Sequence, residues 1–313
     1  MSSVAAPVAD RLAVIGLGLI GSSLLRAARA QGAARVCVGY DHDADIRDTA
    51  RVLDIADHIE DALSAAVSEA DLIIIATPVG VIGDVATAIA PHLRPGAIVS
   101  DVGSVKAAVA EAFAATLPKH VHGVPGHPVA GTEQSGPEAG FAALFAARWC
   151  ILTPGPETDA EAVARLSAFW RRLGATVELM SPDHHDRVLA VTSHLPHLIA
   201  YTIVGVASDL EQVTEAEVVK FSAGGFRDFT RIAASDPTMW RDVFLNNREA
   251  VLELLGRFTE DLIALQRAIR WGEGETLHEH FTRTRAIRRE VIETGQDTAA
   301  PDFGRRPAPD DQA

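Results

Sequence analysis

The fold is decided by the stretch RLAVIGLGLIGSSLLRAARAQGAARVCVGYD, residues 11–41. An apolar strand is predicted over its first residues, and the glycines Gly16, Gly18 and Gly21 follow directly. Gly16 lets the chain turn sharply off the strand, Gly18 leaves the backbone open to a pyrophosphate, and Gly21 lets the next helix approach the sheet. The N-terminus of that helix offers unpaired N–H groups and a partial positive charge to phosphates.

A second predicted strand, Val36–Tyr40, ends in Asp41, where a carboxylate accepts hydrogen bonds from the ribose hydroxyls and repels a 2′-phosphate. This order of strand, glycines, helix, strand and acid predicts a dinucleotide site that prefers NAD to NADP. A glycine-rich helix entry in some other α/β protein would leave Asp41 unexplained. The cofactor-binding residues predicted from this segment are Gly16, Gly18, Leu19, Ile20, Gly21 and Asp41.

Composition limits the class of protein. The chain has 313 residues, enough for two domains, and its 48% hydrophobic content supports a sizeable core. The net charge of −14 argues against a nucleic-acid partner, which requires a basic surface. Only two cysteines occur, Cys37 and Cys150, and both fall in predicted strands, so we expect buried thiols. The histidine spacings form no recognisable metal-binding motif, and we expect no metal.

Targeting and membrane signals are not evident in the sequence. Residues 1–10 show no basic region followed by an apolar stretch, so we expect no secretory signal. No apolar run approaches about 18 residues, so we expect no membrane-spanning segment. The expected compartment is the cytoplasm.

The first part of the chain alternates between strand and helix patterns, which predicts an α/β Rossmann-type, doubly wound parallel sheet over residues 1–180. The predicted strands are Leu12–Ile15, Val36–Tyr40, Leu72–Ala76, Ala97–Asp101, Val121–Val124, Trp149–Thr153 and Thr176–Leu179. The predicted helices are Ser22–Gln31, Val79–His92, Val105–Leu117 and Ala160–Leu173. Asp159 is the predicted N-cap of the last helix.

After Ser181 no strand pattern is found, and residues 181–294 are predicted to form an all-α domain. The predicted helical stretches are Asp183–Val206, Glu215–Phe221, Thr238–Trp271 and Glu273–Glu293. Val251–Leu265 carries a broad apolar face suited to helix packing and a subunit interface. The tail, residues 295–313, is rich in Pro, Asp, Gly and Ala and is expected to be disordered.

Ligands of open α/β sheets bind beyond the carboxyl ends of the strands, so the loops that follow the predicted strands are candidates for the site. Thr77 and Pro78 follow the third strand and should flank the cofactor, and Ser104 follows the fourth. The polar, glycine-rich segment Gly126–Gly136 follows the fifth and should form a surface loop.

His127 is the candidate proton acceptor in that segment. Hydride removal from a carbinol carbon leaves a hydroxyl proton, and a neutral imidazole is its usual acceptor. The competing interpretation is a structural histidine that caps a loop, but its place after a Rossmann strand favours catalysis. His184, His185, His278 and His280 are given no functional role.

The second domain contributes a polar cluster. Ser193–His197 interrupts an apolar helix, and Pro196 within it weakens a helix interior, as is common at functional sites. Arg231 or Arg227 is suited to hold a substrate carboxylate. The competing interpretation for either arginine is a surface ion pair with Asp228.

Seven segments together resemble the prephenate/arogenate (cyclohexadienyl) dehydrogenase family of tyrosine biosynthesis. They are GLGLIGSS, TPV, DVGSVK, HPVAGTEQSG, SHLPH, GGFRDFTRIAASDPTMW and RDVFLNN, in family order from Arg11 to about Asn247. The resemblance implies oxidative decarboxylation of prephenate to 4-hydroxyphenylpyruvate, or of arogenate to tyrosine, with NAD as the cofactor.

The resemblance also implies residue roles. His127 would take the proton of the ring hydroxyl, and Ser104 would bridge this histidine, the substrate and the nicotinamide. Ser193 and His197 would line the substrate pocket, and Arg231, oriented by Asp228, would grip a carboxylate. The remaining implied contacts are Thr132 and Glu133 as a gating lip and Trp240, which would reach in from the partner of a homodimer. Neither a chorismate mutase segment nor an ACT regulatory domain is expected.

Two alternatives stay open from the residues alone. One is another two-domain NAD enzyme of the β-hydroxyacid dehydrogenase type, which uses a lysine of its second domain. Lys220 is the only lysine after residue 119 and lies in a different context. The other is a non-catalytic NAD-binding sensor, which would need no proton acceptor such as His127 beside the nicotinamide.

Overall fold

The computed structural model describes residues 6–214 and 224–293. By its internal contacts the chain divides into two units, Met1–Val251 and Leu252–Ala313. The predicted helix Glu215–Phe221 and the tail after residue 294 lie outside the described residues.

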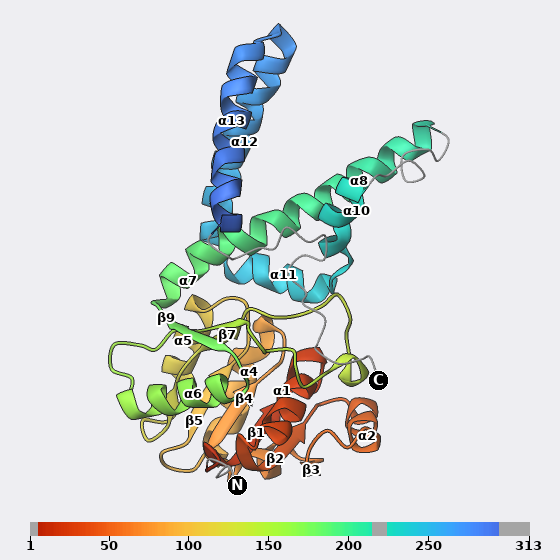
Figure 1. The fold of residues 1–313 in the computed structure, drawn as a ribbon. Coiled ribbons are helices and arrows are strands. Elements are labelled where there is room, and N and C mark those ends of the chain that lie inside the picture. Colours follow the sequence, from red (N-terminus) through yellow and green to blue (C-terminus); the bar gives the residue numbers. More distant parts are fainter. Residues whose placement is uncertain (1–5, 215–223, 294–313) are drawn as a thin grey trace. The chain divides into compact units, whose positions relative to one another are not determined.

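The main sheet lies in the first unit (Figure 1). Its strands are β1 Ala9–Ile15, β2 Ala34–Tyr40, β3 His58–Ile59, β4 Leu72–Ile75, β5 Ile98–Asp101 and β6 His122–Gly123. They are all parallel, in the order β3-β2-β1-β4-β5-β6. This confirms the Rossmann-type prediction, and the order reverses between β1 and β4, where dinucleotides bind in such sheets. The two-residue strand β3 was not predicted.

A second, three-stranded sheet corrects the prediction of a single parallel sheet. It comprises β7 Gly126–Pro128, β8 Trp149–Leu152 and β9 Thr176–Leu179, and β7 runs antiparallel to β8. The segment predicted as a surface loop therefore begins as a buried strand, with His127 opposite Ile151. Glycine and proline at the ends of β7 are typical of turns, which concealed the strand.

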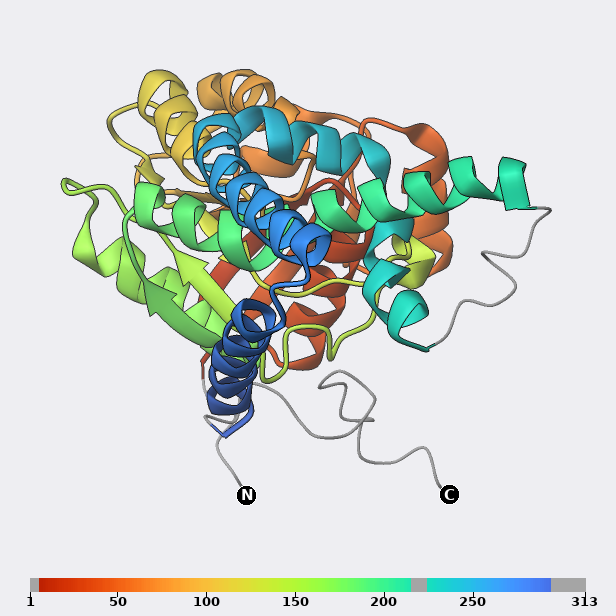
Figure 2. The ribbon, with the colours of Figure 1, turned by 90° about the horizontal axis from the view of Figure 1, so that it is seen from above.

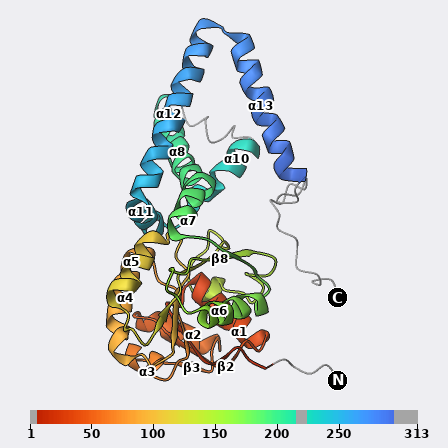
Figure 3. The same ribbon diagram turned by 90° about the vertical axis from the view of Figure 1, so that its left-hand side faces the viewer.

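Helices cover both faces of the main sheet (Figure 3). The helices of this part are α1 Leu19–Ala30, α2 Ala44–Val52, α3 Leu63–Val67, η1 Val79–Val81, α4 Ile82–Ile89, η2 Ala90–His92, α5 Ala107–Thr116, η3 Pro137–Ala139 and α6 Ala160–Arg172. One core packs α1 and α6 on the sheet, with Phe169 and Trp170 fully buried, and the other packs α3, α4 and α5. Asp159 caps α6 by accepting the Ala162 N–H at 2.9 Å, as predicted.

After residue 181 the described chain is helical without a strand. The elements are α7 Pro182–Leu189, η4 Ala190–His194, α8 Leu195–Thr214, α10 Gly224–Thr230, η5 Arg231–Ala234, α11 Pro237–Asn246, α12 Arg248–Trp271 and α13 Gly274–Glu293. In the first unit, α7 and α8 cross above the edge at which the parallel strands end (Figures 1 and 2). The predicted helix Thr238–Trp271 is divided at Asn247, whose side chain bonds to α7 instead of facing solvent.

The predicted irregularity around Pro196 is a π-helical turn. η4, Ala190–His194, has π geometry and lies between α7 and α8. Pro196 has no N–H for the carbonyl of Thr192 four residues earlier, and its ring crowds that carbonyl, so the turn before it widens. Such single π turns are frequent at functional sites.

The expectation that no segment is long and apolar enough to cross a membrane is wrong on those two criteria. Among the described residues, Pro182–Asp209 passes both, with a mean hydropathy of 1.4 over its most apolar window, of which 22% is buried. A core or interface helix of a soluble protein passes the same test. This helix carries three polar side chains that are buried and hydrogen-bonded within the first unit: His185, Asp186 and His194. Their burial favours a helix that packs in the protein core over one that crosses a membrane.

Candidate active site

Three glycines, Gly16, Gly18 and Gly21, form the glycine cradle at the end of β1. Gly16 has φ +96°, and a Cβ atom on it would lie 2.6 Å from the carbonyl oxygen of Ala76. A Cβ on Gly21 would lie 1.9 Å from the carbonyl oxygen of Gly16, so neither position accepts a side chain. Gly18 is different, because a Cβ there meets nothing within 4 Å. The open space at Gly18 suits a pyrophosphate in contact with the backbone.

Asp41 directly follows β2 and lies beside the glycine cradle, at the position that the sequence predicts. Its carboxylate is buried and accepts the N–H of Leu17 at 2.8 Å and that of Asp43 at 3.0 Å, which ties the acid to the glycine cradle. Thr77 Oγ1, at the end of β4, is buried without a hydrogen-bond partner among the described residues. Leu19 and Ile20 begin α1, and Pro78 precedes η1. An open cradle, an anchored acid and an unpaired hydroxyl fit a bound dinucleotide.

A fully buried ion pair between Asp101 and Lys106 lies in the loop from β5 to α5 and was not anticipated from the sequence. Asp101 accepts the N–H groups of Gly103 at 2.7 Å and Gly126 at 3.0 Å, and Lys106 Nζ donates to the Gly126 carbonyl at 2.8 Å. Burial raises the pKa of Asp101 and lowers the pKa of Lys106, and their mutual attraction opposes both shifts. The pair therefore holds both backbone groups of Gly126, the residue before His127.

His127 lies in β7 and is 6% exposed. Its Nδ1 lies 2.8 Å from Nε2 of His185 in α7, and the two rings meet edge to face. Burial lowers the pKa of His127 well below the ordinary histidine value, so its imidazole is neutral at neutral pH. The sequence indicates no role for His185, because its place near the start of a helix does not reveal this contact with His127.

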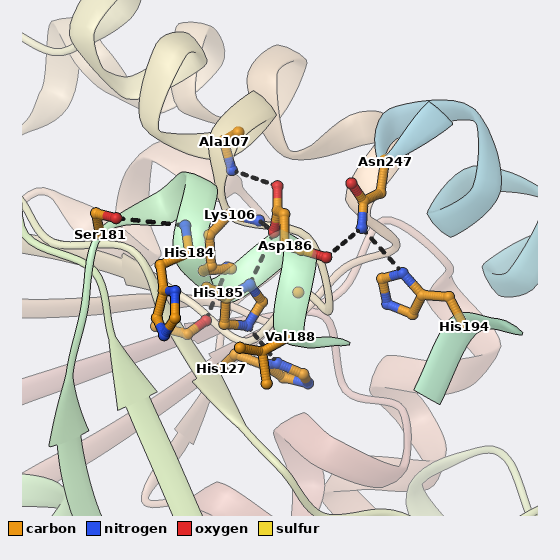
Figure 4. A network of polar contacts seen from close by, with 12 residues as sticks. Lys106, Ala107, His127, Ser181, His184, His185, Asp186, Val188, His194 and Asn247 are labelled. Atoms are coloured by element: carbon orange, nitrogen blue, oxygen red, sulfur yellow. Dashed lines mark hydrogen bonds and ion pairs between the residues drawn. The ribbon is translucent and has the colours of Figure 1, made fainter. Parts of the chain in front are cut away.

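His127, His185, Asp186, His194 and Asn247 form the histidine cluster (Figure 4). His185 Nδ1 lies 2.7 Å from Asp186 Oδ1. Asn247 donates to the Asp186 carbonyl at 2.8 Å and lies 3.1 Å from His194 Nδ1. Burial lowers the pKa of His194 to about 4. The cluster thus joins β7, α7, η4 and the residue between α11 and α12.

Ser104 lies at the mouth of the loop from β5 to α5, half-buried. Within the described part of the chain its side chain makes no hydrogen bond to His127, whose Nδ1 is taken by His185. The backbone of Ser104 faces His194. The structure therefore brings Ser104 to the histidine cluster through His194.

Trp240 corrects one implied role. It is buried in its own chain, where it stacks on His197 with ring centroids 3.7 Å apart and also contacts His194. The expectation that it reaches in from a partner subunit is therefore wrong. His197 Nδ1 bonds to the carbonyl of Ser193 at 2.8 Å, which places Ser193, His197 and Trp240 together beside the histidine cluster. Trp240 Nε1 is buried and has no hydrogen-bond partner among the described residues.

Arg231 forms its ion pair with Glu133 at 3.3 Å, and no pair with Asp228 is present in the described residues. The expectation that Asp228 orients Arg231 is therefore wrong, because η5 turns the arginine toward the segment after β7. Arg231 and Glu133 are both partly exposed. Thr132 Oγ1 accepts the N–H of Gln134 and shapes the same segment.

Comparison with known proteins identifies the family of this chain. A family model described as the nucleotide-binding domain of prephenate dehydrogenase matches residues 24–179, and one described as its dimerization domain matches residues 181–283. The cyclohexadienyl dehydrogenase of Zymomonas mobilis is 45% identical over 281 residues, which cover 90% of this chain and 96% of that protein. The prephenate dehydrogenase of Bacillus subtilis is 34% identical, with coverages of 94% and 79%.

Solved structures extend the likeness to three dimensions. Prephenate dehydrogenase from Aquifex aeolicus, in complex with hydroxyphenyl propionate and NAD+, matches with a TM-score of 0.83 and 33% identity, over 90% of this chain and 98% of that one. Synechocystis arogenate dehydrogenase matches with a TM-score of 0.76 and 29% identity, over 90% and 99%. The chain therefore belongs to the prephenate dehydrogenase family.

Proposed function

We propose that this chain catalyses the NAD-dependent oxidative decarboxylation of prephenate, arogenate or both, in tyrosine biosynthesis. The observation that carries the proposal is the buried, neutral His127, which directly follows Gly126 in the chain. The N–H of Gly126 donates to Asp101 at the carboxyl end of β5, and its carbonyl accepts from Lys106, so His127 lies beside the dinucleotide-binding sheet. The names of the relatives, prephenate, arogenate and cyclohexadienyl dehydrogenases, support the same reaction.

His127 acts as the proton acceptor. Its Nε2 takes the proton of the ring hydroxyl as the O–H bond breaks, and burial keeps this nitrogen unprotonated before the reaction. Bound NAD supplies the hydride acceptor for the carbon that carries this hydroxyl. Loss of the ring carboxylate as carbon dioxide leaves its bonding electron pair to the ring, which becomes aromatic. Because aromatisation drives the reaction, the residues mainly position the substrate and polarise its hydroxyl.

The helical part anchors the substrate. Ser193, His197 and Trp240 form one wall, with the indole N–H free to donate to a ligand. Arg231 offers a guanidinium to a substrate carboxylate, and Glu133 holds it at the entrance until the substrate displaces that pair. Ser104, beside His194, bridges the reacting hydroxyl and the nicotinamide.

The nucleotide edge selects NAD. Gly16, Gly18 and Gly21 leave the backbone open to the pyrophosphate, and Asp41 accepts the ribose hydroxyls with the lone pairs that Leu17 and Asp43 leave free. A 2′-phosphate would meet the charge of Asp41, which disfavours NADP.

The chain forms a homodimer through its helical domain, residues 181–294, and acts in the cytoplasm with residues 1–180 as the nucleotide domain. The family model over residues 181–283 is described as a dimerization domain. Apolar side chains exposed on α12 and α13 support this assignment. They include Leu262, Ile263, Ile269, Trp271, Phe281 and Ile287.

Steady-state NADH formation tests the proposal. The purified chain is assayed with prephenate and with arogenate, each with NAD and with NADP. We expect turnover with NAD and at least one of the two substrates, and the ratio of the two kcat/KM values identifies the preferred one. Absence of turnover with both substrates, together with intact NAD binding, would favour a non-catalytic sensor.

A further inference from the structure

Three side chains of the histidine cluster form a linear relay: His127 in β7, then His185 and Asp186 in α7 (Figure 4). The His127 Nδ1 to His185 Nε2 distance is 2.8 Å, and the His185 Nδ1 to Asp186 Oδ1 distance is 2.7 Å. His185 is fully buried and Asp186 nearly so. The positions of the hydrogen atoms in this relay follow from the hydrogen bonds of Asp186.

Asp186 can only accept at this site. Its Oδ1 accepts the N–H of Lys106 at 2.7 Å, and its Oδ2 accepts the N–H of Ala107 at 2.9 Å, at the N-terminus of α5. Both oxygens are thus hydrogen-bond acceptors for backbone N–H groups at the start of α5, as in a helix N-cap. The close contact between Asp186 Oδ1 and His185 Nδ1 therefore requires the proton on His185 Nδ1.

The remaining protons are then determined. Burial lowers the pKa of both His127 and His185, so each ring is neutral near pH 7 and carries one N–H. His185, protonated at Nδ1, has a bare Nε2 that accepts a hydrogen bond. His127 Nδ1 must supply that bond, and this leaves His127 Nε2 bare. The bare Nε2 is the atom that a proton acceptor needs.

We propose that His185, held by Asp186, is a positioning residue that fixes His127 in the tautomer with the proton on Nδ1. The inference rests on the proposed function of His127 as the proton acceptor. When His127 takes the substrate proton at Nε2, its Nδ1–H donates to His185 Nε2 as a charge-assisted hydrogen bond, which is stronger than a neutral one. The relay therefore sets the reactive nitrogen before the reaction and stabilises the imidazolium after it.

Among the described residues, no other titratable group that acts on His127 can replace His185 as the hydrogen-bond acceptor for His127 Nδ1. Lys106, from the loop after β5, is engaged with Asp101 and the Gly126 carbonyl. His194, from η4, has its Nδ1 beside Asn247. These two groups and His185 are the titratable groups that act on His127. Without His185, His127 Nδ1 loses its acceptor, and the two neutral tautomers compete.

Two substitutions at one position test the proposal. His185→Leu removes the acceptor and keeps an apolar side chain in the core, whereas His185→Gln retains an amide oxygen that can accept from His127 Nδ1. We expect His185→Leu to lower kcat on the order of 10–100-fold with KM and the NAD Kd within about twofold, and His185→Gln to recover a large part of kcat. His184→Leu is the matched control, because His184 is the exposed neighbour on the same helix and should leave kcat unchanged.

The tautomer itself is read by nitrogen NMR on protein labelled in its histidines, with His127 assigned by its loss in His127→Asn. We expect a protonated Nδ1 and a bare Nε2 in the wild type, and averaged signals in His185→Leu. An unchanged tautomer in His185→Leu, or an unchanged kcat, would overturn the proposal. The NMR measurement needs no substrate, so it tests the relay even if neither prephenate nor arogenate is turned over, which would refute the proposed function instead.

Discussion

The glycine cradle and the histidine cluster are built in opposite ways. Gly16, Gly18 and Gly21 are neighbours in sequence, and their geometry depends on backbone contacts within one turn and with the end of β4. The histidine cluster joins residues 58 and 61 positions apart through side-chain hydrogen bonds between buried elements. The shape of the glycine cradle is thus a local property of one turn, whereas the histidine cluster depends on the packing of helical residues against the sheet.

The largest expected effect separates the two regions directly. His127→Asn removes the proton acceptor and should lower kcat by on the order of 10²–10⁴-fold, while the NAD Kd stays within about twofold, because the glycine cradle is untouched. Steady-state kinetics and calorimetric titration with NAD measure the two quantities. A parallel loss of NAD affinity would show that the regions are not independent.

Breaking the Asp101–Lys106 pair tests how strongly the docking depends on buried charge. Lys106→Met leaves the buried carboxylate of Asp101 unpaired and should lower the free energy of unfolding by about 3–5 kcal/mol in urea denaturation. The double variant Asp101→Leu with Lys106→Met removes both charges and should recover part of that loss. If the double variant is no more stable than Lys106→Met alone, the uncompensated charge is not the cause.

Acid should weaken the histidine cluster. The pKa of His194 is about 4 in the folded protein because of burial, against about 6.5 when exposed, so the unfolded chain binds a proton first as the pH falls. The free energy of unfolding therefore falls by about 3 kcal/mol as the pH is lowered from about 6.5 to about 4. Urea unfolding across this range measures it. His194→Gln should flatten the profile, and an identical slope in both proteins would contradict the assignment.

The smallest expected effect is a loss of NAD affinity caused by a methyl group in the glycine cradle. Gly18→Ala has room for its methyl group in the free protein, so the free energy of unfolding should change by less than about 1 kcal/mol. The NAD Kd should nevertheless rise at least about tenfold, or about 1.4 kcal/mol, since the methyl occupies the pyrophosphate space. Gly21→Ala is the contrasting variant and should lower both stability and affinity. Normal NAD binding by Gly18→Ala would place the pyrophosphate elsewhere.

Much of the fold was predictable because its signals are local. Hydrophobic patterns locate β1, β2, β4 and β5 to within a few residues, and Asp159 was identified as a cap from residue type alone. The short strand β3 and the antiparallel strand β7 carry too few residues for a period, and β7 begins with glycine and ends with proline.

The site was predictable only in part. His127 was identified from its place after a strand, but its partner His185 was not, because a pairing over 58 residues leaves no pattern in the sequence. The ion pair between Asp101 and Lys106 likewise has no pattern in the sequence. For Arg231 the sequence suggests its near neighbour Asp228 as a partner, whereas the structure pairs it with the distant Glu133. Residue type and position singled out His127 as a candidate, and only the tertiary structure shows which buried side chains it meets.

Both backbone groups of Gly126 are hydrogen-bonded: its N–H donates to Asp101, and its carbonyl accepts from Lys106. Asp101 and Lys106 lie on either side of Ser104 in the sequence, and Asp101 ends β5, the strand next to β4 in the nucleotide-binding sheet. This short loop therefore holds His127, the proposed proton acceptor, at a fixed place relative to the nucleotide-binding sheet. A sequence change that lengthens or shortens residues 101–106 would therefore shift His127 relative to the sheet, even with every proposed reacting side chain intact.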